Sequence, residues 1–224
     1  MTHEHPPIPD GQGDAHEAAL RKRLRERALT HRQAMPAERR AQLTLRIARH
    51  LDELVARLQP DTLGFCWPYR AEPDLRDWVQ GWLAARPGRV ASLPVVLERH
   101  APMTFRAWTP GVPMPLDRHG IPHPADGVEV QPELVLVPLN AFDDHGYRIG
   151  YGGGYFDRTL ALMRTVAVGV GFEAGRVPDT FPQPHDRPMQ WLVTEAGAFE
   201  ARPRNQLADR NMRLAGFSLS GVKS

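Results

Sequence analysis

The run Leu134-Val-Leu-Val-Pro138 constrains the fold of this chain more than any other segment. It is apolar almost throughout and only five residues long, which is typical of a strand buried on both faces. A second run of this kind spans residues 62–67. Such strands occur mainly in parallel sheets, because the helices that connect the strands cover both sides. We therefore expect a parallel sheet between layers of helices.

Segments with helical periodicity alternate with the predicted strands. Four of them are predicted as helices, beginning near Asp14, Pro36, Leu75 and Tyr155. Further strands are predicted at residues 89–96, 103–108, 166–170 and 191–194. The first helix has a thin apolar stripe between Ala18 and Leu29, with arginines crowded around it. This alternation predicts an α/β fold with a mainly parallel sheet and helices on both faces, a three-layer α/β/α sandwich.

The predicted elements all lie within residues 14–201, which we expect to form a single domain. Residues 1–13 are polar and rich in proline and histidine, so a flexible arm is expected there. Residues 202–224 lack periodicity and are expected to form a loosely ordered tail. No apolar stretch reaches the roughly 18 residues of a membrane helix, and the N-terminus lacks the apolar region of a secretory signal. We therefore expect a cytoplasmic protein without membrane contact.

Arginine dominates the basic residues, because only Lys22 and Lys223 among the 28 lysines and arginines are lysine. Neither lysine follows a glycine-rich run, which excludes a phosphate loop of the G-x-x-x-x-G-K-[ST] type. A formal net charge of +2 is a weak basis for binding nucleic acid, so no such partner is expected. Cys66 is the only cysteine, which excludes a disulfide framework and a thiolate zinc site.

The most informative segment contains four glycines within residues 150–154, between a predicted buried strand and a predicted helix. Parallel sheets bind ligands at this edge, and glycines there let backbone amides surround an anion. Arg148 can add a bidentate fork for phosphate oxygens, and Asp157 can hold Mg²⁺ that bridges phosphates. The loop therefore predicts a phosphate site, with a flexible glycine hinge as the alternative. Its G-x-G-G-G spacing does not fit a dinucleotide-binding loop.

The stretch Gly146-Tyr-Arg-Ile-Gly-Tyr-Gly-Gly-Gly-Tyr-Phe-Asp-Arg158 resembles the signature of the 5-formyltetrahydrofolate cyclo-ligase family (methenyltetrahydrofolate synthetase). Other segments resemble that family in the same order along the chain. They are Arg21-Lys-Arg-Leu-Arg25, Trp67-Pro-Tyr-Arg-Ala-Glu-Pro-Asp74, Gly120-Ile-Pro-His-Pro124, Val137-Pro138, and His185-Asp186 through Val193-Thr194-Glu195. The resemblance covers residues 15–195, and several motifs in order are far more specific than any one of them.

The resemblance implies an enzyme that closes 5-formyltetrahydrofolate, with or without a polyglutamate tail, to 5,10-methenyltetrahydrofolate. ATP and Mg²⁺ would be required, and ADP and phosphate would be released. A formamide oxygen is a poor leaving group, so it would first be phosphorylated, after which nitrogen 10 attacks the activated carbon. The protein would mainly position the substrates and neutralise charge. We expect it to act as a monomer.

The resemblance also implies roles for individual residues. ATP would be bound by Arg21, Lys22, Arg25, Arg148, Ile149, Gly150, Tyr151, Gly152, Gly153, Gly154, Tyr155 and Phe156. Arg148 would also be the catalytic residue. The folate would contact Trp67, Glu72, Tyr151 and Tyr155, and Mg²⁺ would bind Asp157 and Asp186. Gly153 stands where some family members carry a lysine, so the loop would rely on its amides and Arg148 for charge.

Each of these roles has a simpler structural alternative. Trp67 can be a core residue at a strand end, Glu72 can favour the start of the next helix, and the arginines of the first helix can form a solvated face. Two other functions also stay open. One is an arginine-rich, non-catalytic nucleic-acid-binding protein, and the other is a different phosphate-ester enzyme on a similar sheet.

Overall fold

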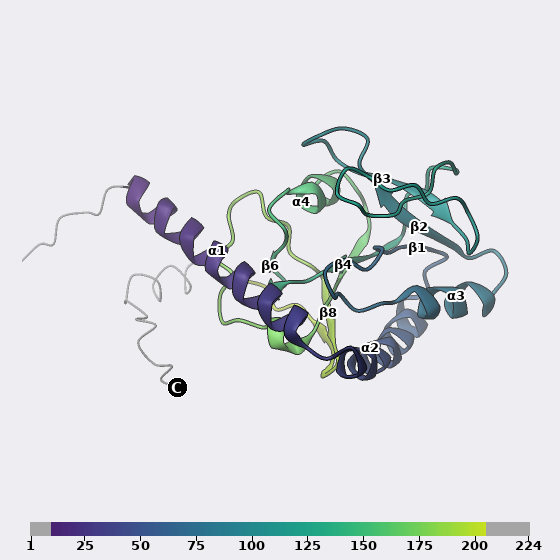
Figure 1. Ribbon diagram of the computed structural model, residues 1–224, viewed down its shortest axis with the longest axis horizontal. Helices are drawn as coiled ribbons and strands as arrows, with labels where there is room; N and C mark the ends of the chain where they lie inside the picture. Colours follow the sequence, from purple (N-terminus) through teal and green to yellow (C-terminus); the bar gives the residue numbers. More distant parts are fainter. Residues whose placement is uncertain (1–9, 205–224) are drawn as a thin grey trace, which may run out of the picture.

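The structure, a computed structural model, describes residues 10–204 and is built around one seven-stranded sheet (Figure 1). The sheet has the strand order β3-β2-β1-β4-β7-β8-β9. Its strands are β1 (Thr62–Gly64), β2 (Val90–Val95), β3 (Thr104–Trp108), β4 (Leu134–Pro138), β7 (Val166–Val170), β8 (Trp191–Thr194) and β9 (Gly197–Glu200). The five inner strands are parallel, while β3 and β9 pair antiparallel at the two edges. The predicted, mainly parallel sheet is confirmed.

Strand β4 shows why the sheet needs a layer on each side. Leu134 and Leu136 join a core with the helices α2 (Ala37–Leu58) and α3 (Arg76–Ala84). Val135 and Val137 point the other way, because side chains alternate along a strand, and pack in a second core under α4 (Tyr155–Leu160). All four side chains are at most 3% exposed. The three-layer arrangement is therefore confirmed, although α4 is short and loops cover much of its layer (Figure 1).

The first helix, α1 (Asp10–Ala34), departs from the expectation in two ways. It begins at Asp10, so Asp14 is not its first residue, and residues 10–13 of the predicted arm are helical. The face of α1 that is buried against the rest of the protein is also not the predicted apolar stripe. Ala18 and Ala19 are exposed, whereas Arg32 is buried. An arginine can occupy such a position only when acceptors in other segments satisfy its donors.

A small hairpin connects the sheet to the glycine loop. It consists of β5 (Ala141–Phe142) and β6 (Arg148–Ile149), which pair antiparallel, and it packs against α1 (Figure 1). The sequence did not predict these two-residue strands, which are too short to show a periodicity, and it did not predict the four-residue β9. Strand β1 is shorter than the predicted run 62–67, because it ends at Gly64, and α4 ends at Leu160. Of the predicted C-terminal tail, residues 205–224 lie outside the described part of the chain, as do residues 1–9 of the predicted arm.

The sheet topology defines one special edge. The chain leaves β1 towards β2 on one side, and it leaves β4 towards β7 on the other. Neighbouring strands whose connections run in opposite directions leave a crevice at their carboxyl ends, where α/β proteins bind ligands. The segments that follow β1 and β4 therefore border the expected ligand-binding crevice. Within residues 10–204, no helix has the length and apolar character needed to span a membrane.

Candidate active site

The glycine loop precedes α4, as the sequence predicted, but the strand directly before it is β6 of the hairpin, which the sequence did not predict. Gly152 and Gly154 have φ values of +95° and +64°, a backbone region that residues with a Cβ rarely adopt. The loop is open at Gly150, which has no atom within 4 Å of an added Cβ, whereas arginine and tyrosine side chains lie within 4 Å of added Cβ positions at the other three glycines. At Gly150 the side of the backbone where a Cβ would stand is thus free of side chains.

Two arginines hydrogen-bond to carbonyl oxygens of this loop. The Nε of Arg25 donates to the oxygen of Gly150 at 2.7 Å, and Nη2 of Arg158 donates to the oxygen of Gly153 at 2.5 Å. Burial, and then the charge of nearby Arg21, lower the pKa of Arg25. A polyanion would relieve this repulsion. Arg158 was not predicted as part of the site, because no spacing rule connects its side chain with the loop.

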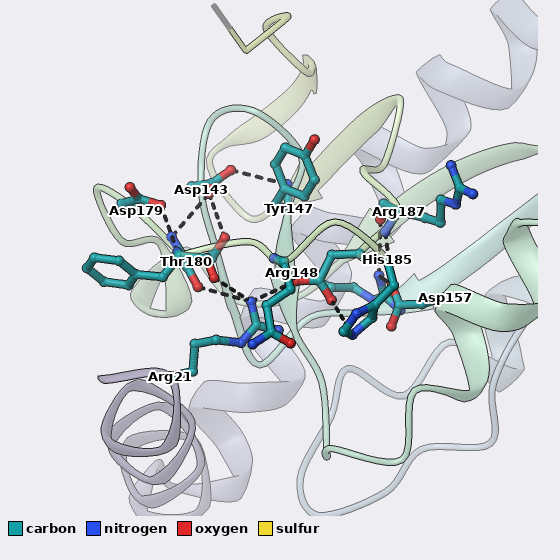
Figure 2. Close-up of polar contacts among 12 residues, drawn as sticks. Arg21, Asp143, Tyr147, Arg148, Asp157, Asp179, Thr180, His185 and Arg187 are labelled. Carbon is teal, nitrogen blue, oxygen red and sulfur yellow. Dashed lines mark hydrogen bonds and ion pairs between the residues drawn. The ribbon is translucent and has the colours of Figure 1, made fainter. Parts of the chain in front are cut away.

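The predicted catalytic residue and the predicted metal ligand form an ion pair (Figure 2). Nη1 of Arg148 donates to Oδ1 of Asp157 at 3.0 Å, and the backbone N–H of Arg187 donates to the same oxygen at 3.1 Å. The side chains are only 5% and 15% exposed. Arg148 is therefore held rigidly behind the loop, with its charge already compensated.

Arg21 forms a second ion pair, with Asp186, at 2.7 Å. The same nitrogen, Nη1, also donates to the backbone oxygens of Thr180 and Phe181. This contact fastens α1 to the segment before β8. Lys22, by contrast, points outward: its side chain is 72% exposed and lies 3.9 Å from Glu26 on the same helix. Of the predicted ATP ligands on α1, Arg25 hydrogen-bonds to the glycine loop, whereas Arg21 binds the segment before β8 and Lys22 faces solvent.

The two predicted metal ligands do not form a protein-only cage. Among the described residues, no three His, Cys, Asp or Glu side chains converge on a point that could hold a metal ion. Mg²⁺ in nucleotide enzymes is commonly bound by one or two carboxylates together with phosphates and water. Asp157 fits that kind of site, because Oδ1 takes both of the hydrogen bonds described above and leaves Oδ2 for a cation.

A buried carboxylate that the sequence did not single out supports this region. Asp143 is fully buried between the hairpin strands and accepts hydrogen bonds from the hydroxyl of Thr180 at 2.7 Å and from three backbone amides (Figure 2). Burial raises the pKa of Asp143, although these donors lower it in part. The network ties the hairpin to the Thr180 segment, whose carbonyl Arg21 contacts. It therefore holds the base of the glycine loop in place.

The second part of the site lies at the carboxyl end of β1, on the edge that the topology marks. The Tyr151 hydroxyl donates to Oε1 of Glu72 at 2.6 Å, and Arg32 Nη2 donates to the Tyr151 oxygen at 2.7 Å. Oε2 of Glu72 accepts the backbone N–H of Tyr69 at 3.1 Å. Glu72 is 8% exposed, and burial raises its pKa, opposed by Tyr151 and Arg32. Tyr151 thus joins the glycine loop to Glu72.

The remaining predicted residues differ in what their side chains can reach. Ile149 is fully buried, so only its backbone could face a ligand. The Trp67 ring packs at the rim of the core, edge-on to Trp108, with the guanidinium of Arg76 over it at 4.8 Å. Phe156 packs against the second core, and Tyr155 has Arg158 over its ring at 5.3 Å. Of the predicted folate residues, Glu72 and Tyr151 are in direct contact.

Comparison with known proteins identifies the family. The model of the 5-formyltetrahydrofolate cyclo-ligase family matches residues 17–195, and this range contains every site residue described above. The chain belongs to this family. A 5-formyltetrahydrofolate cyclo-ligase of Haemophilus influenzae is 26% identical over 154 residues, covering 64% of this chain and 80% of that protein. The Escherichia coli cyclo-ligase is 34% identical over 71 residues, 30% of this chain and 39% of that protein.

Solved structures agree with this family membership. The NMR structure of Aquifex aeolicus 5,10-methenyltetrahydrofolate synthetase has a TM-score of 0.72 and 26% identity, covering 84% of this cyclo-ligase family member and 95% of that chain. The Mycoplasma pneumoniae synthetase has a TM-score of 0.60 at 20% identity, covering 78% and 98%, and supports the fold alone. The α/β fold and the predicted family are both confirmed.

Proposed function

We propose that this chain is an ATP-dependent 5-formyltetrahydrofolate cyclo-ligase, which forms 5,10-methenyltetrahydrofolate and releases ADP and phosphate. The observation that carries the proposal is the contact between the glycine loop and Glu72 through Tyr151 at the family's matched segments. The proposed phosphate-binding loop is then joined to a buried carboxylate by a single side chain, that of Tyr151. Such proximity is what transfer of a phosphoryl group from ATP to a bound folate requires.

The reaction needs activation of an unreactive formamide. In the first step the formyl oxygen attacks the terminal phosphorus of ATP, so that a P–O bond forms and ADP leaves. Nitrogen 10 then attacks the formyl carbon, phosphate leaves with the former formyl oxygen, and nitrogen 10 loses its proton. Negative charge on the transferring phosphoryl group is the main demand on the protein. Arg25, which hydrogen-bonds to the glycine loop, would help to meet it, and Arg148, whose charge is already paired with Asp157, would contribute by holding that carboxylate in place.

Mg²⁺ would be held by Asp157 and Asp186, together with the ATP phosphates. When bound, the ion neutralises phosphate charge and orients the phosphates for transfer. The chain's own contribution is to hold both carboxylates in fixed positions through hydrogen bonds. Arg148 fixes Asp157, and Arg21 with the backbone N–H of Gln183 fixes Asp186. The loop amides from Gly150 to Phe156 would contact the phosphates directly.

The folate would lie against Glu72, Tyr151, Tyr155 and Trp67. A pterin ring presents N–H groups along one edge, and an ionised carboxylate accepts two of them at once. Glu72 can do so, because its two present hydrogen bonds occupy only part of its acceptor capacity. We further propose that the enzyme is a cytoplasmic monomer, that it accepts folates with or without a polyglutamate tail, and that it needs no nucleic-acid partner.

The direct test is an assay of the purified full chain with MgATP and 5-formyltetrahydrofolate. The expected result is an ATP-dependent product that absorbs in the near ultraviolet, together with one ADP per turnover. The proposal is refuted if neither is formed. Turnover of a sugar phosphate in place of formylfolate would favour another phosphate-ester enzyme. Steeply salt-dependent RNA or DNA binding without any turnover would favour the nucleic-acid-binding alternative.

A further inference from the structure

We propose that Arg32 and Tyr151 form a hydrogen-bonded link that makes the two substrates bind cooperatively. The link runs from the carboxylate of Glu72 in the folate pocket to the glycine loop that holds ATP. The inference rests on the proposed function, because it takes Glu72 as a folate contact and residues 150–154 as the phosphate loop. It adds roles for Arg32 and Tyr151 as positioning residues that tie the two halves of the site together.

Tyr151 is the only residue of the segment 150–154 with a side chain, since the other four are glycines. Its hydroxyl lies between two charged groups, donating to Glu72 at 2.6 Å and accepting from Arg32 at 2.7 Å. Its ring makes an edge contact with Tyr69, with centroids 5.4 Å apart. Any displacement of the loop at Tyr151 must therefore break a charge-assisted hydrogen bond to the carboxylate of Glu72.

Arg32 fixes the position of this link. It is 5% exposed, and besides Tyr151 its guanidinium donates to the backbone oxygen of Arg70 at 3.0 Å and of Leu139 at 3.3 Å. These acceptors belong to the segments that follow β1 and β4, the strands on either side of the topological crevice. One side chain of α1 thus joins the glycine loop to both carboxyl ends.

The turn that carries Glu72 needs this support. Arg70 and Ala71 have φ values of +46° and +62°, and consecutive non-glycine residues in the left-handed region are strained. The turn persists because the Glu72 carboxylate accepts the N–H of Tyr69 and Arg32 holds the Arg70 carbonyl. Arg32 therefore determines where the Glu72 carboxylate points as well as where Tyr151 lies.

Cooperativity follows because each substrate has to order part of the glycine loop when it binds. Glycine-rich backbone loses much conformational freedom when it is fixed around phosphates. A folate bound to Glu72 would hold that carboxylate, and through it Tyr151, so the loop would be ordered in part before ATP arrives. The second substrate then has less ordering to complete and binds more tightly. By reciprocity, ATP must tighten folate binding by the same factor.

The test measures the dissociation constant of a non-hydrolysable ATP analogue with Mg²⁺ by calorimetry, with and without saturating 5-formyltetrahydrofolate. For the wild type we expect the analogue to bind about fivefold to 50-fold more tightly when folate is present. In Tyr151→Phe, which keeps the ring but removes the hydroxyl, the ratio should fall to within about twofold of unity. Arg32→Lys should lose the coupling too, because lysine cannot donate to three acceptors in a fixed fork.

Tyr147→Phe is the matched control, since this hydroxyl lies on the hairpin outside the glycine loop, and its ratio should equal that of the wild type. Wild-type protein that binds both ligands with no coupling would overturn the link while leaving the proposed function intact. An unchanged ratio in Tyr151→Phe would overturn it as well. Wild-type protein that binds neither ligand would instead refute the proposed function, and the link with it.

Discussion

Replacement of Glu72 by glutamine gives the sharpest test of the folate pocket, because it removes a charge and almost no volume. In the wild type the carboxylate has four acceptor sites, of which Tyr69 and Tyr151 use two. Two are left for folate N–H groups. An amide keeps one oxygen, but it replaces the other with N–H donors that face the donors of the substrate.

The size of the effect follows from this count. A hydrogen bond to a charged acceptor is worth about 1–1.5 kcal/mol more than one to a neutral acceptor, so two bonds correspond to about 2–3 kcal/mol. We therefore expect Glu72→Gln to raise the KM for 5-formyltetrahydrofolate roughly 30- to 150-fold. The affinity for the ATP analogue, measured without folate, should change by less than about threefold, since glutamine still accepts from Tyr151.

The pH dependence of folate binding supplies an independent readout. Burial raises the pKa of Glu72, so its carboxylate becomes protonated above the ordinary glutamate value of 4.5 as the pH falls. Folate affinity of the wild type should decline as the pH falls through this raised pKa, whereas Glu72→Gln should show no such decline. The assay is the KM for formylfolate between mildly acidic and neutral pH, with saturating MgATP.

The same shift fixes the sign of the stability effect. The folded state holds the Glu72 proton more tightly than the unfolded state, so the contribution of Glu72 to stability is present below pH 4.5 and lost as the pH rises through the raised pKa. At neutral pH the burial of the charged carboxylate outweighs its ion pair with Arg32, 3.9 Å away, so the charge destabilises the free protein. Glu72→Gln should thus melt at the same or a higher temperature there. An unaltered KM, or a glutamine variant that melts several degrees lower, would refute this reasoning.

Three further substitutions test the other parts of the site. Arg25→Ala should raise the KM for ATP about tenfold, because it removes a guanidinium that lies 2.7 Å from the loop. Asp157→Asn should lower the free energy of unfolding by about 3 kcal/mol, since Arg148 loses its partner, and should raise the Mg²⁺ concentration for half-maximal rate. Gly146→Ala should destabilise by about 2–5 kcal/mol in urea unfolding, because φ is +82° and a Cβ would lie 2.3 Å from a carbonyl oxygen. Gly81→Ala, in open space on α3, is its control and should stabilise slightly; equal midpoints for the two glycine variants would contradict the last prediction.

The fold could be predicted wherever burial required a regular pattern of apolar residues along the sequence. Strand β4 is found at the predicted residues 134–138, because both of its faces are buried and every position had to be apolar. Helix α2 follows its leucines for the same reason. Short elements such as β9 and the β5–β6 hairpin were missed, because two to four residues are too few to show a periodicity in the sequence.

The inward face of α1 shows the limit of the periodicity argument. Leu24 and Ala28 are only partly buried, while Arg32 further along the same helix is buried at 5% exposure. A rule that places apolar residues inside assigns this arginine to solvent. Arg32 is buried because distant backbone oxygens and a tyrosine hydroxyl accept hydrogen bonds from its guanidinium. The sequence alone does not show that these groups lie close together in the fold.

The sequence by itself determined the chemical inventory of this protein. It has a glycine loop, two lysines that cannot serve a lysine-dependent phosphate loop, an excess of arginine, and ordered segments that resemble one enzyme family. Only the tertiary structure decided which arginines lie at the site and what they contact. Arg32 reaches acceptors 38, 107 and 119 residues away, whereas Lys22, inside a predicted motif, faces solvent. Local periodicity records whether a side chain is buried in apolar surroundings. The partners of a buried charge are set by strand order, which brings together residues from distant parts of the chain.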